Sequence, residues 1–179
     1  MPVSAVEEGD RLLVTAAEGS DAWRRTAYGY INDNEHSLLE EWDRERAVEV
    51  TFAAAFDSQF DQAGLMIRVD EERWIKAGVE YADGALQLGA VVTDTYSDWS
   101  TGPVPEWAGR DVTVRASRMD DAVAIRARVD DEPWRLVRLA PFAGDASAKA
   151  GPFCCAPSRS GLTVSFSAWQ LVEPDENLH

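Results

Sequence analysis

Two stretches in the middle of the chain, DQAGLMIR (61–68) and WIKAGVEY (74–81), decide the fold. In each of them an apolar residue occupies every second position, and the acidic segment between them, DEER (70–73), has the composition of a tight turn. Because successive side chains of a strand point to opposite faces of a sheet, each stretch divides into two faces. The pattern predicts an antiparallel hairpin with one face in the core.

The two faces of this hairpin differ in character. One face is uniformly apolar and is predicted to be core: Ala63, Leu65, Ile67, Val69, Ile75, Ala77, Val79 and Tyr81. The other face carries most of the polar groups: Gln62, Arg68, Trp74, Lys76 and Glu80, with Gly64 and Gly78 among them. Glycine inside a strand often marks the close approach of a ligand or of another backbone. The polar face is therefore either the floor of a ligand groove or a solvated surface with salt bridges.

The same alternation continues on both sides of the hairpin, in the ranges 48–56, 111–119, 122–130, 134–140 and 161–172. Turn signals rich in Asp, Gly and Pro separate these runs. Many short alternating runs with such turns predict an all-β fold, a two-sheet antiparallel β-sandwich or jelly roll. Only residues 37–46 have a pattern compatible with two helical turns, and they are equally compatible with a loop.

Length and composition indicate one domain. The chain has 179 residues, of which 45% are hydrophobic, and this is sufficient for a single core across residues 1–179. The acidic end, 173–179, is expected to fray. A net charge of −15 disfavours nucleic acid and anionic membranes as partners. No apolar run resembles a signal peptide or a membrane span.

The cysteines and histidines make a metal site improbable. Cys154 and Cys155 are adjacent, and a disulfide between neighbours is strained, so both are expected to be buried thiols in a reducing, cytoplasmic setting. The two histidines, His36 and His179, are far apart in the sequence, and no Cys-x-x-Cys motif is present. No metal and no cofactor are expected.

Four motifs in fixed order carry a family resemblance: DQAGLMIR (61–68), WIKAGVEY (74–81), VVT (91–93) and SDWS (97–100). Weaker matches lie at 20–36 and 151–166. Over about residues 20–172 the chain resembles the domain-of-unknown-function family 1349, also described as regulation-of-enolase-like, although the Trp-rich opening frequent in that family is absent. The resemblance implies a concanavalin A-like sandwich whose concave face holds sugars in related folds, and it implies no reaction.

Positions inside the motifs give the candidate site. Carried over from the resemblance, they are Trp23, Arg24, Gln62, Lys76, Glu80, Asp98, Trp99 and Ser100. Trp74 is added from the polar face of the hairpin, and Arg115 and Arg138 from strand alternation. The SDWS motif is interpreted as a turn that carries an aromatic residue.

Three functions remain open. The first is binding of a carbohydrate or another small polar ligand by aromatic residues, including Tyr28 and Tyr30, beside polar groups. The second is a cytoplasmic regulator, monomeric or dimeric, that binds another protein. The third is a glycosidase or other sugar-acting enzyme that uses Glu80 and Asp98, with Lys76 as a base. Binding is ranked first and catalysis last.

Overall fold

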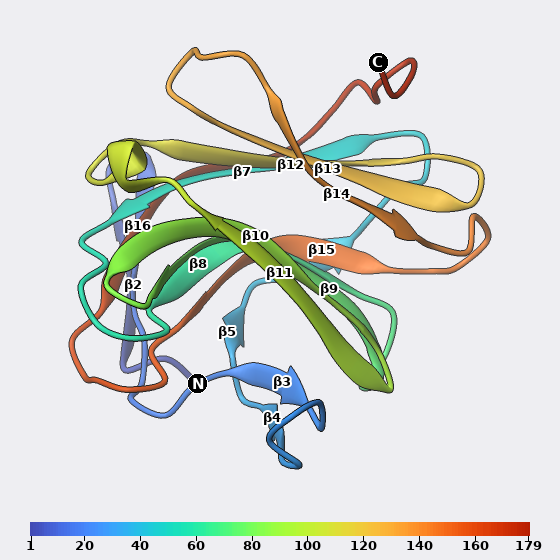
Figure 1. The fold of residues 1–179 in the computed structure, drawn as a ribbon. Coiled ribbons are helices and arrows are strands. Elements are labelled where there is room, and N and C mark those ends of the chain that lie inside the picture. Colours follow the sequence, from blue (N-terminus) through green and yellow to red (C-terminus); the bar gives the residue numbers. More distant parts are fainter.

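The computed structural model describes all 179 residues, and two antiparallel sheets of seven strands each are stacked face to face in it (Figure 1). The first sheet has the order β1 (Ser4–Glu8), β2 (Arg11–Thr15), β16 (Thr163–Val172), β7 (Ala47–Ala54), β12 (Val112–Arg118), β13 (Ala122–Val129) and β14 (Arg135–Pro141). The second has the order β11 (Tyr96–Pro103), β10 (Ala85–Asp94), β9 (Arg73–Ala82), β8 (Gln62–Arg68), β15 (Lys149–Cys155) and β5 (His36–Ser37), and β6 (Glu40–Glu41) also pairs with β15.

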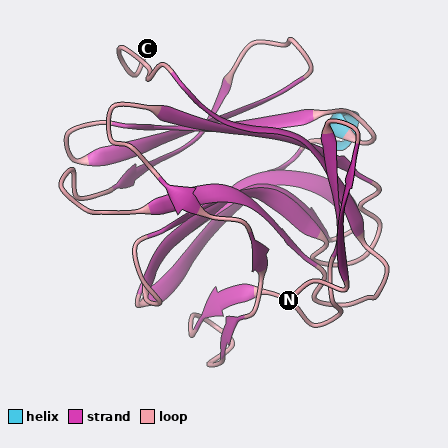
Figure 2. Ribbon diagram, turned by 180° about the vertical axis from the view of Figure 1, so that it is seen from behind, coloured by secondary structure: helices cyan, strands magenta, loops and turns pink.

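Two small elements complete the chain. A separate hairpin of β3 (Ala22–Arg24) and β4 (Ile31–Asp33) lies beside the second sheet, on the side away from the first sheet (Figure 1). The 3₁₀ turn η1 (Pro105–Trp107) is the only helical segment, seen at one edge in Figure 2. No helix in the structure has the length and apolar character that crossing a membrane requires.

The core between the sheets confirms the predicted sandwich. It contains the inward side chains of both layers. Val50 and Phe52 of β7 belong to the same buried cluster as Leu65 and Ile67 of β8. Leu65 and Ile67 lie on the apolar face that alternation assigned to the core, and both are about 1% exposed. The hairpin turn is also confirmed, because β8 pairs with β9 from Gln62–Glu80 to Arg68–Trp74.

Residues 37–46, which could have formed two helical turns, contain no helix. Their backbone instead reaches β15 through the short strands β5 and β6. Trp42 packs into the main core, and its indole N–H donates to the carbonyl of Arg46. Packing of one tryptophan therefore outweighs the weak helical pattern.

The acidic C-terminal segment has contacts that the sequence did not indicate. Asp175 forms ion pairs with Arg115 of β12 and Arg126 of β13, and its backbone N–H donates to Ser117. The carbonyl of Leu178 accepts from Arg126. These contacts hold residues 173–179 against the first sheet, where fraying was expected.

The expectation of buried free thiols is confirmed for both cysteines. Burial raises the pKa of Cys154 to about 12, and it raises the pKa of Cys155 well above its usual value. Reactive cysteines need an accessible thiolate, so these two side chains act as packing groups.

A row of three glycines crosses the centre of the second sheet. Gly64 lies opposite Gly78, which lies opposite Gly89 on the next strand. A Cβ atom on Gly64 would lie 2.0 Å from the carbonyl oxygen of Ala77, and a Cβ on Gly78 would lie 2.2 Å from that of Ala63. The neighbouring backbones therefore occupy the space of a side chain, and they can approach only because these residues are glycine.

Alanine at Gly64 should destabilise the protein severely, because its Cβ would collide with backbone that cannot move independently of the sheet. We expect Gly64→Ala to lower the free energy of unfolding by about 3 kcal/mol or more, measured by urea denaturation. The control is Gly102→Ala on β11, where an added Cβ meets nothing within 4 Å. Its effect should stay within about 0.5 kcal/mol, and similar losses in both variants would contradict the role of the glycine row.

Candidate functional site

A cavity of about 340 Å³ lies between the second sheet and the β3–β4 hairpin. We call it the hairpin cavity. Its walls come from the hairpin and the segments beside it, and its floor comes from β8 to β11. The lining residues are Gly19, Asp21, Trp23, Tyr28, Tyr30, Asn32, Phe60, Gln62, Lys76, Glu80, Val91, Trp99 and Pro157.

Strand register assembles the floor. Lys76 lies opposite Val91 on β10, which lies opposite Trp99 on β11, so the three form one row across the sheet. Glu80 lies opposite Gln62 in a second row. The glycine row runs between them, since residues two apart on a strand share a face. The register thereby brings Lys76, Glu80 and Trp99 to one surface. Lys76 and Glu80 are separated along one strand, and Trp99 is distant from both in the sequence.

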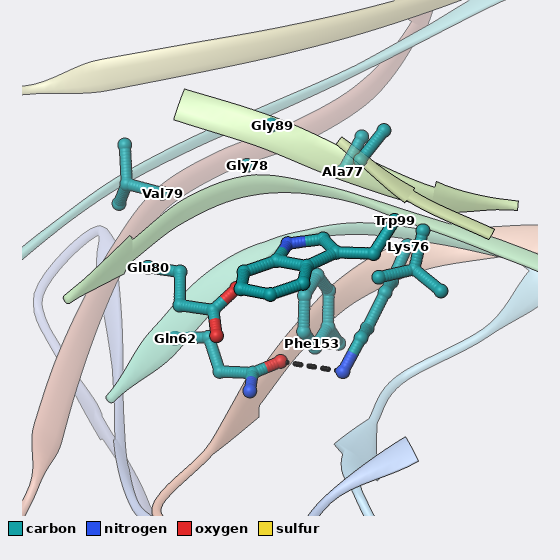
Figure 3. A pocket seen from close by; sticks show the side chains of 11 residues that line it. Gln62, Lys76, Ala77, Gly78, Val79, Glu80, Gly89, Trp99 and Phe153 are labelled. Atoms are coloured by element: carbon teal, nitrogen blue, oxygen red, sulfur yellow. Dashed lines mark hydrogen bonds between the residues drawn. The ribbon is translucent and has the colours of Figure 1, made fainter. Parts of the chain in front are cut away.

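The glycine row also determines how Trp99 lies. Its indole extends across the floor toward Glu80, over strands where Gly78 and Gly89 present no side chain (Figure 3). Ala77 and Val79 point to the other side of the sheet (Figure 3). The indole therefore rests over the sheet and offers a flat apolar surface to the cavity.

Lys76 is the central polar contact of the cavity. Its ammonium donates to Asp21 Oδ1 at 2.9 Å and to Gln62 Oε1 at 2.7 Å, and the residue is 5% exposed (Figure 3 shows the contact with Gln62). Burial acts to lower the pKa of Lys76, but Asp21, Cys155 and Glu80 act to raise it, and the net shift is upward. Lys76 is therefore a charged anchor here rather than the lowered-pKa base considered from the sequence.

The carboxylate of Glu80 differs from the ammonium of Lys76 because it has no partner in the protein. Glu80 is partly buried at the cavity floor, and its carboxylate has neither a hydrogen-bond partner nor an ion pair within the protein. Burial raises the pKa of Glu80 to about 7, an effect that Lys76 reduces and that Asp21 and Asp83 increase. A carboxyl group that titrates near neutrality inside a cavity is a common feature of binding and catalytic sites.

Aromatic rings form the outer wall. Trp23 meets Tyr28 edge to face with ring centroids 5.8 Å apart, and Tyr28 stacks on Tyr30 at 5.6 Å. The Trp23 indole N–H donates to the carbonyl of Thr26, which closes the loop between β3 and β4. The wall is therefore a pre-formed cluster on one short hairpin.

The structure brings together five of the predicted site residues and separates the rest. Trp23, Gln62, Lys76, Glu80 and Trp99 line the hairpin cavity. Trp74 is 2% exposed and belongs to a second buried cluster that also contains Trp23 and Met66, so it packs beside the cavity, on the same face of β9 as Lys76. Arg24 is buried in an ion pair with Glu72 at 2.6 Å, and it also donates to the carbonyl of Thr95, outside the cavity lining.

The interpretation of SDWS as a turn is wrong, because these residues belong to strand β11. Alternation then places Trp99 on the cavity side and its neighbours Asp98 and Ser100 on the opposite side. There Arg138 of β14 binds both, at 3.0 Å to Asp98 and 2.6 Å to Ser100. Asp98, Ser100 and Arg138 form a separate bridge between the sheets, and the pair Glu80–Asp98 is not assembled in one cavity.

Arg115 also lies elsewhere. It is on β12 of the first sheet, held by Glu49 at 2.7 Å and by Asp175 at 3.0 Å. Alternation correctly placed it on a polar face but could not tell which sheet that face belongs to. No group of three or more His, Cys, Asp or Glu side chains has the spacing to hold a metal ion.

Sequence reasoning missed Asp21, Asn32 and Phe60 as lining residues. Asp21 is the partner of Lys76, and it lies in the 20–36 segment that was singled out for its Trp-Arg pair. The signal for Asp21 was indirect: a mid-strand lysine too far from Glu80 to pair with it needs another carboxylate. The sequence gives no indication of which of the many acidic residues supplies it.

Removal of the Lys76 charge should cost far more than removal of the other lysine. Lys76→Met leaves Asp21, a largely buried carboxylate, without its counterion, and we expect a loss of about 3 kcal/mol in the free energy of unfolding. The control is Lys149→Met, since that ammonium is exposed and 3.5 Å from exposed Glu41. Urea denaturation should show a change below about 1 kcal/mol for the control. Equal effects would show that Lys76 is not an anchor.

The raised pKa of Glu80 should make the protein lose stability as pH rises. The folded state holds the proton up to about pH 7, whereas the unfolded chain releases it near its usual value, 4.5. Between these values stability should fall by at most about 3 kcal/mol. Urea denaturation of wild type and of Glu80→Gln gives the free energy of unfolding at each pH in this range. The contribution of Glu80 is the difference between the two proteins. A difference that does not change with pH would contradict the environment described for Glu80.

Solved structures share this architecture. A functionally unknown protein from Saccharomyces cerevisiae has 37% sequence identity and a TM-score of 0.90, covering 97% of this chain and 94% of its own. A xylan β-1,4-xylosidase from Bacillus halodurans matches at 15% identity and TM-score 0.70, over 91% of this chain and 33% of that chain. A carbohydrate-binding module from Bacillus subtilis matches at 11% identity and TM-score 0.58, over 94% of this chain and 90% of that chain. The latter two similarities establish the β-sandwich fold alone.

The sequence comparisons give the family. The curated protein "Regulation of enolase protein 1" from Saccharomyces cerevisiae is 38% identical over 173 residues, which are 97% of this chain and 87% of that protein. A family model described as "Protein of unknown function (DUF1349)" matches residues 1–174. The match spans both sheets and the hairpin that closes the cavity, and the chain therefore belongs to the DUF1349 family.

Proposed function

We propose that the hairpin cavity binds a carbohydrate or a similar small polyhydroxylated ligand. The observation that carries the proposal is the meeting of flat aromatic surfaces with fixed polar groups in one cavity. Trp99 and Trp23 supply apolar faces, while Gln62, Lys76 and Glu80 supply donors and acceptors. Sugar rings need both, because their C–H faces stack on aromatic rings and their hydroxyls need directional partners.

The dimensions of the cavity favour a small ligand. Its volume of about 340 Å³ is at the low end of the range for small-molecule sites. The fold similarity to a carbohydrate-binding module supports the proposal as an analogy between folds, and the cavity residues of this chain supply the chemistry.

A glycosidase is less well supported. Hydrolysis requires two carboxyl groups placed about a sugar bond, and Asp98 pairs with Arg138 outside the cavity. The other carboxylate that lines the cavity, Asp21, is engaged by Lys76. Glu80 is the one carboxylate of the cavity lining without an ion pair, and a single carboxyl group is sufficient for binding but not for this mechanism.

A protein contact is the second candidate. The tip of the β3–β4 hairpin exposes Tyr28, Tyr30 and Ile31, which are 58%, 46% and 45% accessible. Exposed aromatic residues on one projecting element are typical of an interface, and the relative named for regulation of enolase is consistent with such a role. Ile31→Ala would weaken a contact of this kind, whereas Glu80→Gln at the cavity floor would leave it unchanged.

Neighbouring residues on β11 provide a direct test of the binding proposal. A panel of mono- and oligosaccharides is first screened by quenching of tryptophan emission, and the affinity of the best ligand is then measured by isothermal titration calorimetry. We expect Trp99→Ala to weaken binding by about tenfold or more, because it removes the stacking surface. Asp98→Ala, one residue away on the opposite face, is the control and should leave the affinity unchanged. The absence of saturable binding to any sugar in the panel would refute the proposal.

A further inference from the structure

We infer that the ligand of the hairpin cavity carries a positive charge and is an amino sugar whose ammonium group pairs with Glu80. The inference rests on the proposed function and adds the charge of the ligand to it. It depends on three features of the cavity: the charge balance of its side chains, the groups that remain free to bind, and the faces of its aromatic rings.

The charge balance leaves one carboxyl group, that of Glu80, without a partner. Asp21 and Lys76 form an ion pair at 2.9 Å, and Glu80, although Lys76 acts on it at longer range, forms no ion pair and no hydrogen bond within the protein. A partly buried carboxylate without a partner costs free energy, because it loses water and receives nothing in exchange. A ligand ammonium beside Glu80 would provide the missing partner, and it would complete an ion pair in a site that is already partly dehydrated.

Both carboxylates that line the cavity keep oxygens without a partner in the protein. Asp21 accepts from Lys76, from Gln62 and from the N–H of Ala22 through Oδ1, so Oδ2 has no partner in the protein. Lys76 has three ammonium hydrogens, of which Asp21 and Gln62 take two. The cavity thus presents free carboxylate oxygens on Asp21 and Glu80, and its donors are one remaining ammonium hydrogen of Lys76 and the polar hydrogens of the lining residues Tyr28, Tyr30, Asn32 and Trp99. A ligand ammonium group matches the carboxylate oxygens, and sugar hydroxyls, which both donate and accept, match the remaining groups.

The aromatic rings that line the cavity also favour a positively charged ligand. The faces of Trp and Tyr rings carry partial negative charge and attract cations. Trp23, Tyr28, Tyr30 and Trp99 all line the cavity that contains Glu80. An acidic sugar would instead bring its carboxylate close to Glu80 in a protein whose net charge is −15. The ring faces and the free carboxylate therefore favour the same class of ligand.

A matched ligand series tests the inference with the full-length chain. Affinities at neutral pH are measured by calorimetry for glucosamine, galactosamine and mannosamine, each beside its neutral N-acetyl derivative, its parent hexose and its uronic acid. We expect at least one amino sugar to bind about tenfold or more tightly than its neutral counterparts. The uronic acid should bind most weakly of each set.

Two isosteric variants locate the charge. Glu80→Gln keeps the shape of the side chain and removes its charge, and it should lower the affinity for the amino sugar to that for its neutral counterparts. Glu71→Gln is the control, because Glu71 lies in the exposed turn between β8 and β9. It should retain the advantage in full. Circular dichroism melts establish that both variants are folded.

The outcomes separate the inference from the proposed function. Binding of neutral sugars as tight as that of amino sugars would overturn the inference and leave carbohydrate binding intact. A preference for amino sugars that survives in Glu80→Gln would also overturn it, as would tightest binding of a uronic acid. If no sugar of any charge binds, both the proposed function and the inference fail.

Discussion

The ion pair between Lys76 and Asp21 is the interaction on which the site depends. Lys76 is fixed in the middle of a strand, and Asp21 begins the β3–β4 hairpin, so their contact holds the hairpin against the sheet. Gln62 accepts a second hydrogen bond from the same ammonium. A buried lysine must have such partners, because its desolvation is otherwise too costly. Asp21, which lies outside the sheet that carries Lys76, provides the main partner, and this contact closes the hairpin cavity.

The glycine row is the second constraint. The four strands β8 to β11 approach closely at Gly64, Gly78 and Gly89, and the absence of side chains there leaves room for the indole of Trp99 to lie across the sheet (Figure 3). Larger residues in this row would fill the floor and push Trp99 away. Backbone packing and the shape of the cavity floor are thus determined by the same three positions.

These constraints leave the cavity with an asymmetric polarity. One carboxylate is neutralised by Lys76, and the other, Glu80, is not. Because the pKa of Glu80 is about 7, the charge of the cavity is sensitive to any charged group placed beside this carboxyl. The aromatic wall of the β3–β4 hairpin, by contrast, is assembled from rings of the hairpin itself.

The sequence by itself determined the sandwich, the central hairpin and the face on which Lys76 and Glu80 lie, because alternation with period two is a local property of a strand. It also picked out Trp23 and Trp99, through the family motifs. Only the tertiary structure decided that Asp21 is the partner of Lys76 and that Asp98 and Arg138 lie outside the cavity. Arg115 had the right local pattern and belongs to the other sheet. Contacts between residues distant in the sequence depend on strand order and register across the sheets, and alternation along one strand does not encode either.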